Sequence, residues 1–361
     1  MLLVNLTCAL ALVPLNVGIA LPLHNEDGDG KRAVEYYRGL IMAAEELEKE
    51  GVQVNFFAWN FHKDSDINII LQDPNARKCD LFFGPMYTKQ IPALQEFAEK
   101  YGAKVIIPFS INENPSGKYK NVFQVYIEPA LARKNEIKQF CEYFKNYQVV
   151  VVGCNDEQTN KGDFTADLKR EMTTNKVAYT MTNLTTADNL FAKAFNATKP
   201  NIVVLNSASN TAVKDAFKKL DALMKTNPKV KVSLFGYTEW LMYTNAYAEF
   251  FHRFDTYIHT HSYYNPQGSA TKIFTEKYRA KFGCEMLDYN PRFGIMGYDH
   301  GRFFFRGFSK MGNDYKGIYP NNDALQSRIH FAQVGQNGGM QNIGFKFIHF
   351  NRDRGIYEVA F

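Results

Sequence analysis

The sequence predicts an α/β protein made of two lobes, each a doubly wound parallel sheet, and three observations support this prediction. Stretches with apolar residues at helical spacing alternate with short, continuous Val- and Ile-rich runs, as in parallel sheets that helices cover on both faces. The alternation starts again near residue 130, and 361 residues are enough for two domains. Apolar residues make up 45% of the chain, so each lobe can build a sizeable core.

The first lobe is predicted from a strand–helix alternation that begins near residue 16. After the polar turn HNEDGDG, apolar residues recur at helical spacing from Ala33 to Leu47, and Gly51 ends this helix. Strands are expected at 16–23, 52–59, 79–84, 103–109 and 121–127, and further helices at 66–72 and about 89–101.

The second lobe repeats this pattern, and the end of the chain departs from it. Helices at about 131–146, 161–173, 187–196, 211–225 and 240–252 alternate with strands at 147–153, 176–182, 201–206, 231–236 and 255–264. Two more helices are expected at 269–282 and about 292–311. The last three runs, RIHFAQV, GFKFIHF and IYEVAF, predict antiparallel strands because Gly, Asn and Asp turns separate them.

These patterns predict the domain boundaries. Lobe 1 is expected to comprise residues 17–128 and 265–318, and lobe 2 residues 129–264 and 319–361. The first 16 residues, MLLVNLTCALALVPLN, are apolar but lack the basic start of a secretory signal, so we interpret them as a signal-like or vestigial segment. This segment is too short to span a bilayer, and we find no longer apolar run, so no transmembrane span is predicted.

Composition argues against several classes of function. The formal net charge is only +5 and no run of five basic residues occurs, so nucleic acid is not an expected partner. The 30 Phe and 21 Tyr indicate aromatic-rich cores or stacking surfaces in a cleft. The run GRFFFRG (301–307) indicates a helix core with solvated arginines, or a partner-binding patch. No two of the five cysteines have C-x-x-C spacing, and the sequence leaves open whether two of them form a disulfide.

No enzymatic motif is present, so the chain is predicted not to be an enzyme and to need no cofactor. Walker, G-x-S-x-G and H-E-x-x-H patterns are all missing. The run EDGDGK (26–31) is interpreted as a turn that caps a helix rather than a metal or phosphate site. His259 and His261 share one face of a strand, but no acid or Cys at a fixed spacing completes a ligand set, so no metal site is predicted.

Small, polar or aromatic residues follow most predicted strands. Because ligands of open α/β sheets bind outside the carboxyl ends of the strands, these turns are the candidate binding loops. They carry His24 and Asn25, Tyr87 and Thr88, Ser110 and Asn112, Asn155 and Asp156, Ser207 and Ser209, Tyr237 and Glu239, and Tyr263 and Tyr264.

The order of these pieces resembles the type I periplasmic binding protein fold, as in the branched-chain amino acid receptors of ABC transporters, from residue 17 to the end. The resemblance rests on VGIALPL with YYRGLIMAAEEL, on LFFGPMYTKQIPALQEFAEKYGAKVIIPFS, on IFTEKYRAKFG with YNPRFGIMGYDHGRFFFRG, and on GGMQNIGFKFIHFNRDRGIYEV. It implies two lobes joined by a hinge of three crossings, which close on a small ligand in the interlobe cleft.

The resemblance also implies roles for individual residues. Tyr87-Thr88 and Ser110 to Asn112 match turns that hold the ligand's carboxylate and amine, and Tyr237 and Glu239 match an aromatic residue and an acid of the second lobe. Tyr298-Asp299 stands at the family's Tyr-Asp position. The ligand-binding residues predicted in total are His24, Asn25, Tyr87, Thr88, Ser110, Asn112, Tyr237, Glu239, Tyr263, Tyr298 and Asp299.

The predicted function is that of a periplasmic or envelope solute-binding receptor for an amino acid, a peptide or a wall fragment. The run LPL…EYYRGLIMA is also similar to receptor-like proteins of Bacteroidetes that often follow peptidoglycan-binding LysM modules, although no LysM module is seen in this chain. The alternative is therefore an envelope scaffold or a regulator of peptidoglycan synthesis that binds an envelope protein or peptidoglycan.

Overall fold

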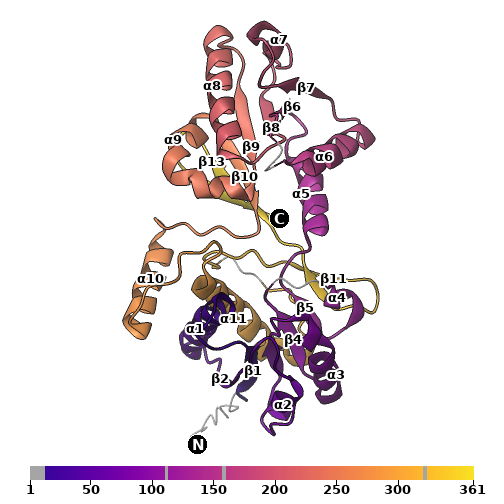
Figure 1. Cartoon of the computed structure of the whole chain (residues 1–361), viewed down its shortest axis with the longest axis vertical. Helices are drawn as coiled ribbons and strands as arrows, with labels where there is room; N and C mark the ends of the chain where they lie inside the picture. The colour runs from indigo at the N-terminus through magenta and orange to yellow at the C-terminus, as the bar shows by residue number, and fades with distance from the viewer. Residues whose placement is uncertain (1–12, 110–112, 157–159, 320–322) are drawn as a thin grey trace, which may run out of the picture. The chain divides into compact units, whose positions relative to one another are not determined.

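The computed structural model describes residues 13–109, 113–156, 160–319 and 323–361 (Figure 1). Its contacts divide the chain into unit 1, Met1–Ile127 with Tyr263–Ile343, and unit 2, Glu128–Ser262 with Gly344–Phe361. The chain therefore passes between the units three times, and the first two passages lie close to the predicted boundaries. The third lies after Ile343 rather than near residue 318, because the strands Phe331–Gln333 and Met340–Asn342 pair within unit 1.

Unit 1 contains a seven-stranded sheet in the order β11-β12-β5-β4-β3-β1-β2, in which only β11 is antiparallel to its neighbour. Its strands are β1 (Leu15–Leu21), β2 (Val54–Asn60), β3 (Leu81–Phe83), β4 (Lys104–Ile107), β5 (Val122–Gln124), β11 (Phe331–Gln333) and β12 (Met340–Asn342). Because Leu15 and Asn16 already pair with β2, the sheet begins inside the segment that we interpreted as signal-like.

Helices cover both faces of this sheet. On β3, Phe83 packs in a core with residues of α1 (Gly28–Glu48) and α11 (Phe293–Met311), whereas Phe82 packs in a second core with α2 (Asn68–Leu71) and α3 (Ile91–Tyr101). The alternation of two adjacent side chains between two cores is what a doubly wound sheet requires. The remaining helical segments of unit 1 are η1 (Ala76–Lys78), η2 (Thr88–Gln90), α4 (Pro115–Lys118), α10 (Ser269–Phe282) and η4 (Gly312–Asp314).

The aromatic run on α11 belongs to the core, as predicted. Phe303, Phe304 and Phe305 are all buried. The expectation of solvated arginines beside them is wrong. Arg306 is buried and paired with Glu50 and Asp323, and Arg302 pairs with Asp323 as well, because buried guanidinium groups need charged or polar partners.

Unit 2 contains a second seven-stranded sheet in the order β14-β13-β10-β9-β8-β6-β7. Its strands are β6 (Gln148–Gly153), β7 (Tyr179–Asn183), β8 (Asn201–Leu205), β9 (Val232–Gly236), β10 (Thr256–Thr260), β13 (Lys346–Phe350) and β14 (Ile356–Ala360). Strands β13 and β14 form the expected antiparallel pair, but the first predicted C-terminal strand lies in the sheet of unit 1 as β11.

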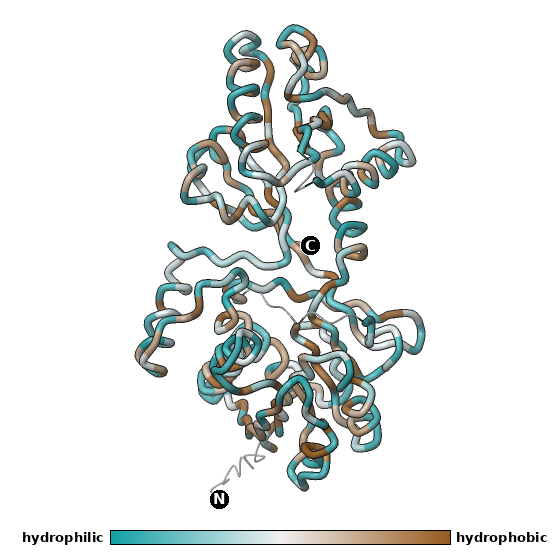
Figure 2. Tube along the Cα trace, in the orientation of Figure 1, coloured by the Kyte–Doolittle hydropathy of each residue, from teal (hydrophilic) through white to brown (hydrophobic). Residues whose placement is uncertain are grey.

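Aromatic contacts attach the helices of unit 2. Phe235 on β9 packs against Phe140 of α5 at 4.7 Å between ring centroids and against Phe164 of α6 at 6.2 Å. Phe217 of α8 stacks on Phe250 of α9 at 4.7 Å. In Figure 2 hydrophilic and hydrophobic residues alternate along the helices, as expected where one face of a helix packs inward. The helical segments are α5 (Pro129–Tyr143), α6 (Gly162–Thr174), α7 (Asp188–Ala192), α8 (Asn210–Thr226), η3 (Thr238–Tyr243) and α9 (Thr244–Arg253).

The closest helix pair of unit 1 depends on glycine. A Cβ atom on Gly297 of α11 would lie 2.0 Å from the carbonyl oxygen of Tyr36, and one on Gly39 of α1 would lie 2.0 Å from the carbonyl oxygen of Gly294. Both obstructing atoms are backbone atoms, so no side-chain rotation can make room. The backbones of α1 and α11 are therefore in direct contact where they cross.

We predict that Gly297→Ala lowers the free energy of unfolding by about 1–3 kcal/mol, because the added methyl group overpacks this crossing. An alanine in a helix interior would otherwise add about 1 kcal/mol of stability, so the expected sign is the reverse of helix propensity. Urea denaturation measures the difference. Gly28→Ala is the matched control, since a Cβ atom there meets nothing within 4 Å. Equal stability of the two variants would contradict the prediction.

Candidate functional site

Three neighbouring strands of unit 1 end side by side. In the parallel register Leu21 of β1 lies opposite Asn60 of β2, and Ile19 lies opposite Phe83 of β3. The loops that follow these strands therefore start at the same edge of the sheet. The strand order reverses between β1 and β3, and ligands of doubly wound sheets bind at such a switch point.

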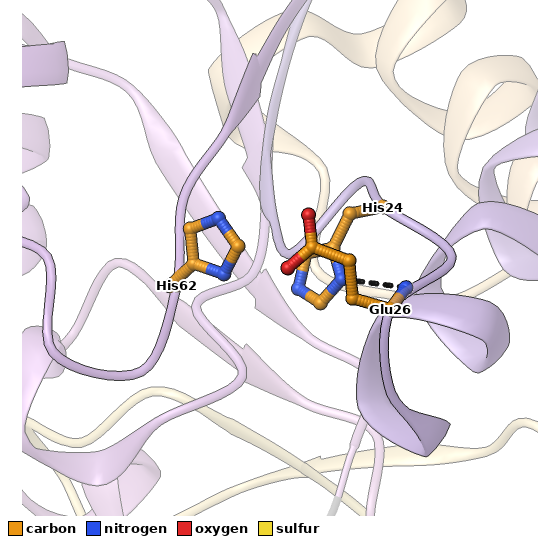
Figure 3. A group of neighbouring side chains, drawn as sticks. All are labelled: His24, Glu26 and His62. Carbon is orange, nitrogen blue, oxygen red and sulfur yellow. Dashed lines mark hydrogen bonds between the residues drawn. The ribbon is translucent and has the colours of Figure 1, made fainter.

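Two histidines from adjacent loops meet at this edge (Figure 3). His24 follows β1 and His62 follows β2, and their rings stack with centroids 4.4 Å apart and an interplanar angle of 23°. His24 is only 8% exposed, and its Nε2 atom has no hydrogen-bond partner within the described residues. His62 is exposed. The pair therefore consists of a buried imidazole ring, that of His24, and a solvent-exposed one, that of His62.

Acidic groups surround the two rings. The backbone N–H of Glu26 donates to Nδ1 of His24 at 3.3 Å, and the Glu26 side chain lies beside both rings in Figure 3. Asp27 caps α1 by accepting from the backbone N–H of Gly30 at 2.7 Å, and this bond lowers the pKa of the Asp27 carboxyl. The turn EDGDGK does cap the helix as predicted, and its Glu also joins the histidine pair.

The loop after β3 completes the edge. Gly84 has a φ of +123°, and a Cβ atom there would lie 2.2 Å from the carbonyl oxygen of Ala20, so only glycine allows this exit from the strand. Tyr87 is half-buried and donates from its hydroxyl to Asp29 at 3.3 Å. Burial and the charge of Asp29 raise the pKa of Tyr87 to about 12, so the hydroxyl stays protonated and keeps its hydrogen bond to Asp29.

Of the other four residues predicted at this edge, the structure describes two. Asn25 is exposed next to His24, and Thr88 is half-buried as the first residue of η2. Ser110 and Asn112 lie outside the described residues, so their role stays a prediction.

Two predicted residues of unit 1, Asp299 and Tyr263, make structural contacts instead. The carboxylate of Asp299 accepts from the backbone N–H groups of Leu325, Gln326 and Ser327 at 2.8, 2.9 and 2.7 Å. The backbone N–H of Tyr263 donates to the carbonyl oxygen of Gln326 at 3.0 Å, and its side chain is buried. Such contacts hold the segment around Gln326 against α11.

Tyr298 faces a different hollow. Its ring packs on Phe274 of α10 at 4.8 Å, and both line a cavity of about 840 Å³ together with Arg302. The cavity is lined by Met42, Glu45 and Glu46 in the second half of α1 and by its C-cap residue Lys49, and this half leads away from the carboxyl edge because α1 begins there. Tyr298 and the histidine pair therefore do not form one site.

In unit 2 the two predicted residues Tyr237 and Glu239 make contacts of different kinds. Tyr237 is fully buried and donates to the carbonyl oxygen of Leu205 at 2.6 Å. Glu239 is half-buried and forms an ion pair of 2.5 Å with Lys161, whose ammonium lies 5.1 Å from the Tyr237 ring centroid. Of these three residues, Glu239 and Lys161 carry the charged groups that a ligand could contact.

The two strand histidines of unit 2 have an acidic partner that the sequence did not suggest. Glu136 of α5 is buried and contacts His259 at 2.9 Å and His261 at 3.1 Å. Burial would raise the pKa of Glu136, but the charges and hydrogen bonds of both histidines lower it overall. Burial likewise opposes protonation of His261, yet its bond to Glu136 raises the pKa of the ring.

The buried cysteine thiols of the described residues are not activated as nucleophiles. The four cysteines in the described part of the chain are free thiols, and burial raises the pKa of Cys79 to about 12, of Cys141 to about 11 and of Cys154 to about 12. The thiols of Cys79, Cys141 and Cys154 are therefore neutral at physiological pH. His62, Glu26 and Glu136 are the residues that sequence reasoning missed, and for His62 its place just after a predicted strand was a usable signal.

Comparison with known proteins identifies the fold. No family model matches the chain, and no curated protein matches it. A solved structure described as a putative branched-chain amino acid ABC transporter from Rhodospirillum rubrum is 14% identical, with a TM-score of 0.53 over 96% of each chain. A branched-chain amino acid ABC transporter periplasmic ligand-binding protein from Burkholderia xenovorans is 13% identical, with a TM-score of 0.50 over 96% of this chain and 94% of that one. The predicted type I periplasmic binding protein fold is thereby confirmed. None of the described helices has the length and apolar character to cross a membrane.

We predict that the thermal stability of unit 2 falls as the pH rises above about 6.5, and that His261→Gln flattens this dependence. The folded-state pKa of His261 is raised above its ordinary value of 6.5. Its stabilising protonation is therefore present below that value and is lost as the pH rises through the raised one. Melting curves followed by circular dichroism test this, with the exposed His330→Gln as control. A slope that survives in His261→Gln would contradict the prediction.

Proposed function

We propose that the protein is a non-catalytic solute-binding receptor of the periplasm or cell envelope, which holds a small ligand at the carboxyl edges of its parallel sheets. The ligand classes proposed are an amino acid, a peptide and a cell-wall fragment. The fold shared with solved ligand-binding proteins of ABC transporters supports this. The observation that carries the proposal is the ring contact of His24 with His62 at the switch point of the first sheet, on loops that neighbour the one carrying Tyr87.

The groups at this edge suit a small polar ligand with both charges. Glu26 offers a carboxylate to an ammonium group, and the histidine rings offer N–H donors to a carboxylate. The Tyr87 hydroxyl donates to Asp29, and its oxygen can also accept from an ammonium group. In unit 2, Lys161 and Glu239 offer one charge of each sign. We do not assign Tyr237 or Asp299 to the ligand, because both use their polar groups in internal hydrogen bonds.

The alternative function, an envelope scaffold or regulator of peptidoglycan synthesis with an envelope protein or peptidoglycan as partner, remains a prediction from the sequence.

A thermal-shift screen with amino acids, short peptides and muropeptides tests the proposal. A ligand that binds only the folded protein adds about 2.7 kcal/mol when its concentration is 100 times its Kd, so a true ligand raises the melting temperature clearly. Isothermal titration of each hit then gives the stoichiometry, which we expect to be one. If every compound leaves the melting temperature unchanged at millimolar concentration, the receptor proposal fails.

For a hit from this screen we predict that Tyr87→Phe weakens binding by about 2- to 12-fold, because one hydrogen bond contributes about 0.5–1.5 kcal/mol. Titration calorimetry measures the change in Kd. Tyr357→Phe is the matched control, since this tyrosine is 55% exposed on β14 of unit 2. An unchanged Kd in Tyr87→Phe would remove its hydroxyl from the ligand contacts.

A further inference from the structure

We infer that His24, Glu26 and His62 form a binding site for a divalent transition metal ion such as Zn²⁺, at the carboxyl edge of the sheet in unit 1. The inference goes beyond the proposed function, because a metal ion can bind these side chains whether or not a solute binds. It also differs from the sequence-based expectation that the chain has no metal site.

The geometry is that of an open ligand set. One donor atom from each of the three residues lies within 4.8 Å of the other two. Bound Zn²⁺ lies about 2.0–2.2 Å from nitrogen and oxygen ligands, which places tetrahedral ligands about 3.4 Å apart. Because Glu26 and His62 are exposed, rotation of these two side chains can bring the donors together without moving the backbone.

His24 supplies the second, independent observation. This side chain is 8% exposed, and its buried Nε2 atom has no hydrogen-bond partner within the described residues. Buried polar atoms almost always have a partner, so the ring lacks one that a cation would provide. Coordination through Nε2 moves the ring proton to Nδ1 and gives up the bond from the Glu26 N–H, which at 3.3 Å is long.

The surroundings favour a cation. The two histidines come from adjacent loops on paired strands, so the backbone holds them next to each other before any ion binds. Asp27, the N-cap residue of α1, follows Glu26 directly in the chain, and Asp29 lies in the first turn of α1. These carboxylates add negative potential near the three ligands.

The ligand types set the expected selectivity. Two imidazoles and one carboxylate suit Zn²⁺, Co²⁺, Ni²⁺ and Cu²⁺, whereas Mg²⁺ and Ca²⁺ prefer sites made of oxygen ligands alone. Three protein ligands leave the fourth position of a tetrahedral site open to water or to another small ligand.

Titration of chelator-treated, untagged full-length protein with Zn²⁺ tests the inference. We expect one equivalent to bind with saturation, Co²⁺ to bind the same site with a visible absorption band, and Mg²⁺ not to compete. His62→Ala and Glu26→Gln should each weaken Zn²⁺ binding by more than about 100-fold, because even groups that only orient a metal ligand contribute 10- to 100-fold. Both residues are exposed, so these variants should fold as the unaltered protein does.

His330→Ala is the control, since this exposed histidine lies on another part of unit 1 and should leave Zn²⁺ binding unchanged. Circular dichroism verifies that each variant is folded. Absence of saturable binding, or equal affinity in His62→Ala and Glu26→Gln, would overturn the inference. Solute binding is measured separately with a chelator present, so the failure of the receptor proposal and the failure of the metal site are distinguishable.

Discussion

The parallel pairing of β1 with β2 and β3 is the constraint on which the candidate site depends. Parallel strands all leave the sheet at the same edge, so the loops after Leu21, Asn60 and Phe83 must start side by side. The pairing brings His24 and His62 into ring contact although 37 other residues separate them in the sequence. Gly84 completes the arrangement, because only glycine lets the chain leave β3 so close to the backbone of Ala20.

Buried carboxylates hold the segments around each sheet in place. In unit 1, Asp299 binds three successive backbone N–H groups, and Glu35 of α1 accepts from the backbone N–H of Gly294 at 3.0 Å. Burial raises the pKa of Glu35, although these hydrogen bonds oppose the shift. In unit 2, Glu136 ties α5 to the end of β10 through two histidines. Polar residues near a strand end therefore either stabilise the fold or are available to a ligand, and their hydrogen bonds and ion pairs distinguish these two roles.

Sequence patterns predicted most of the fold and only part of the candidate site. Continuous Val- and Ile-rich runs indicate buried parallel strands, and helix 269–282 is predicted at its observed bounds. Strand β12, with only three residues, gives no periodic signal, so the third passage between the units was misplaced. Periodicity also cannot show that Tyr237 turns inward or that Glu136 meets His259, because both depend on pairings distant in sequence.

The central claim is that the carboxyl edge of the first sheet binds the ligand. Hydrogen–deuterium exchange with and without a hit from the thermal-shift screen tests it most directly. The account predicts slower exchange of amides in the loops that carry His24, His62 and Tyr87. Slower exchange confined to residues 42–49 and 270–281, which line the cavity of about 840 Å³ between α1 and α10, would contradict the account.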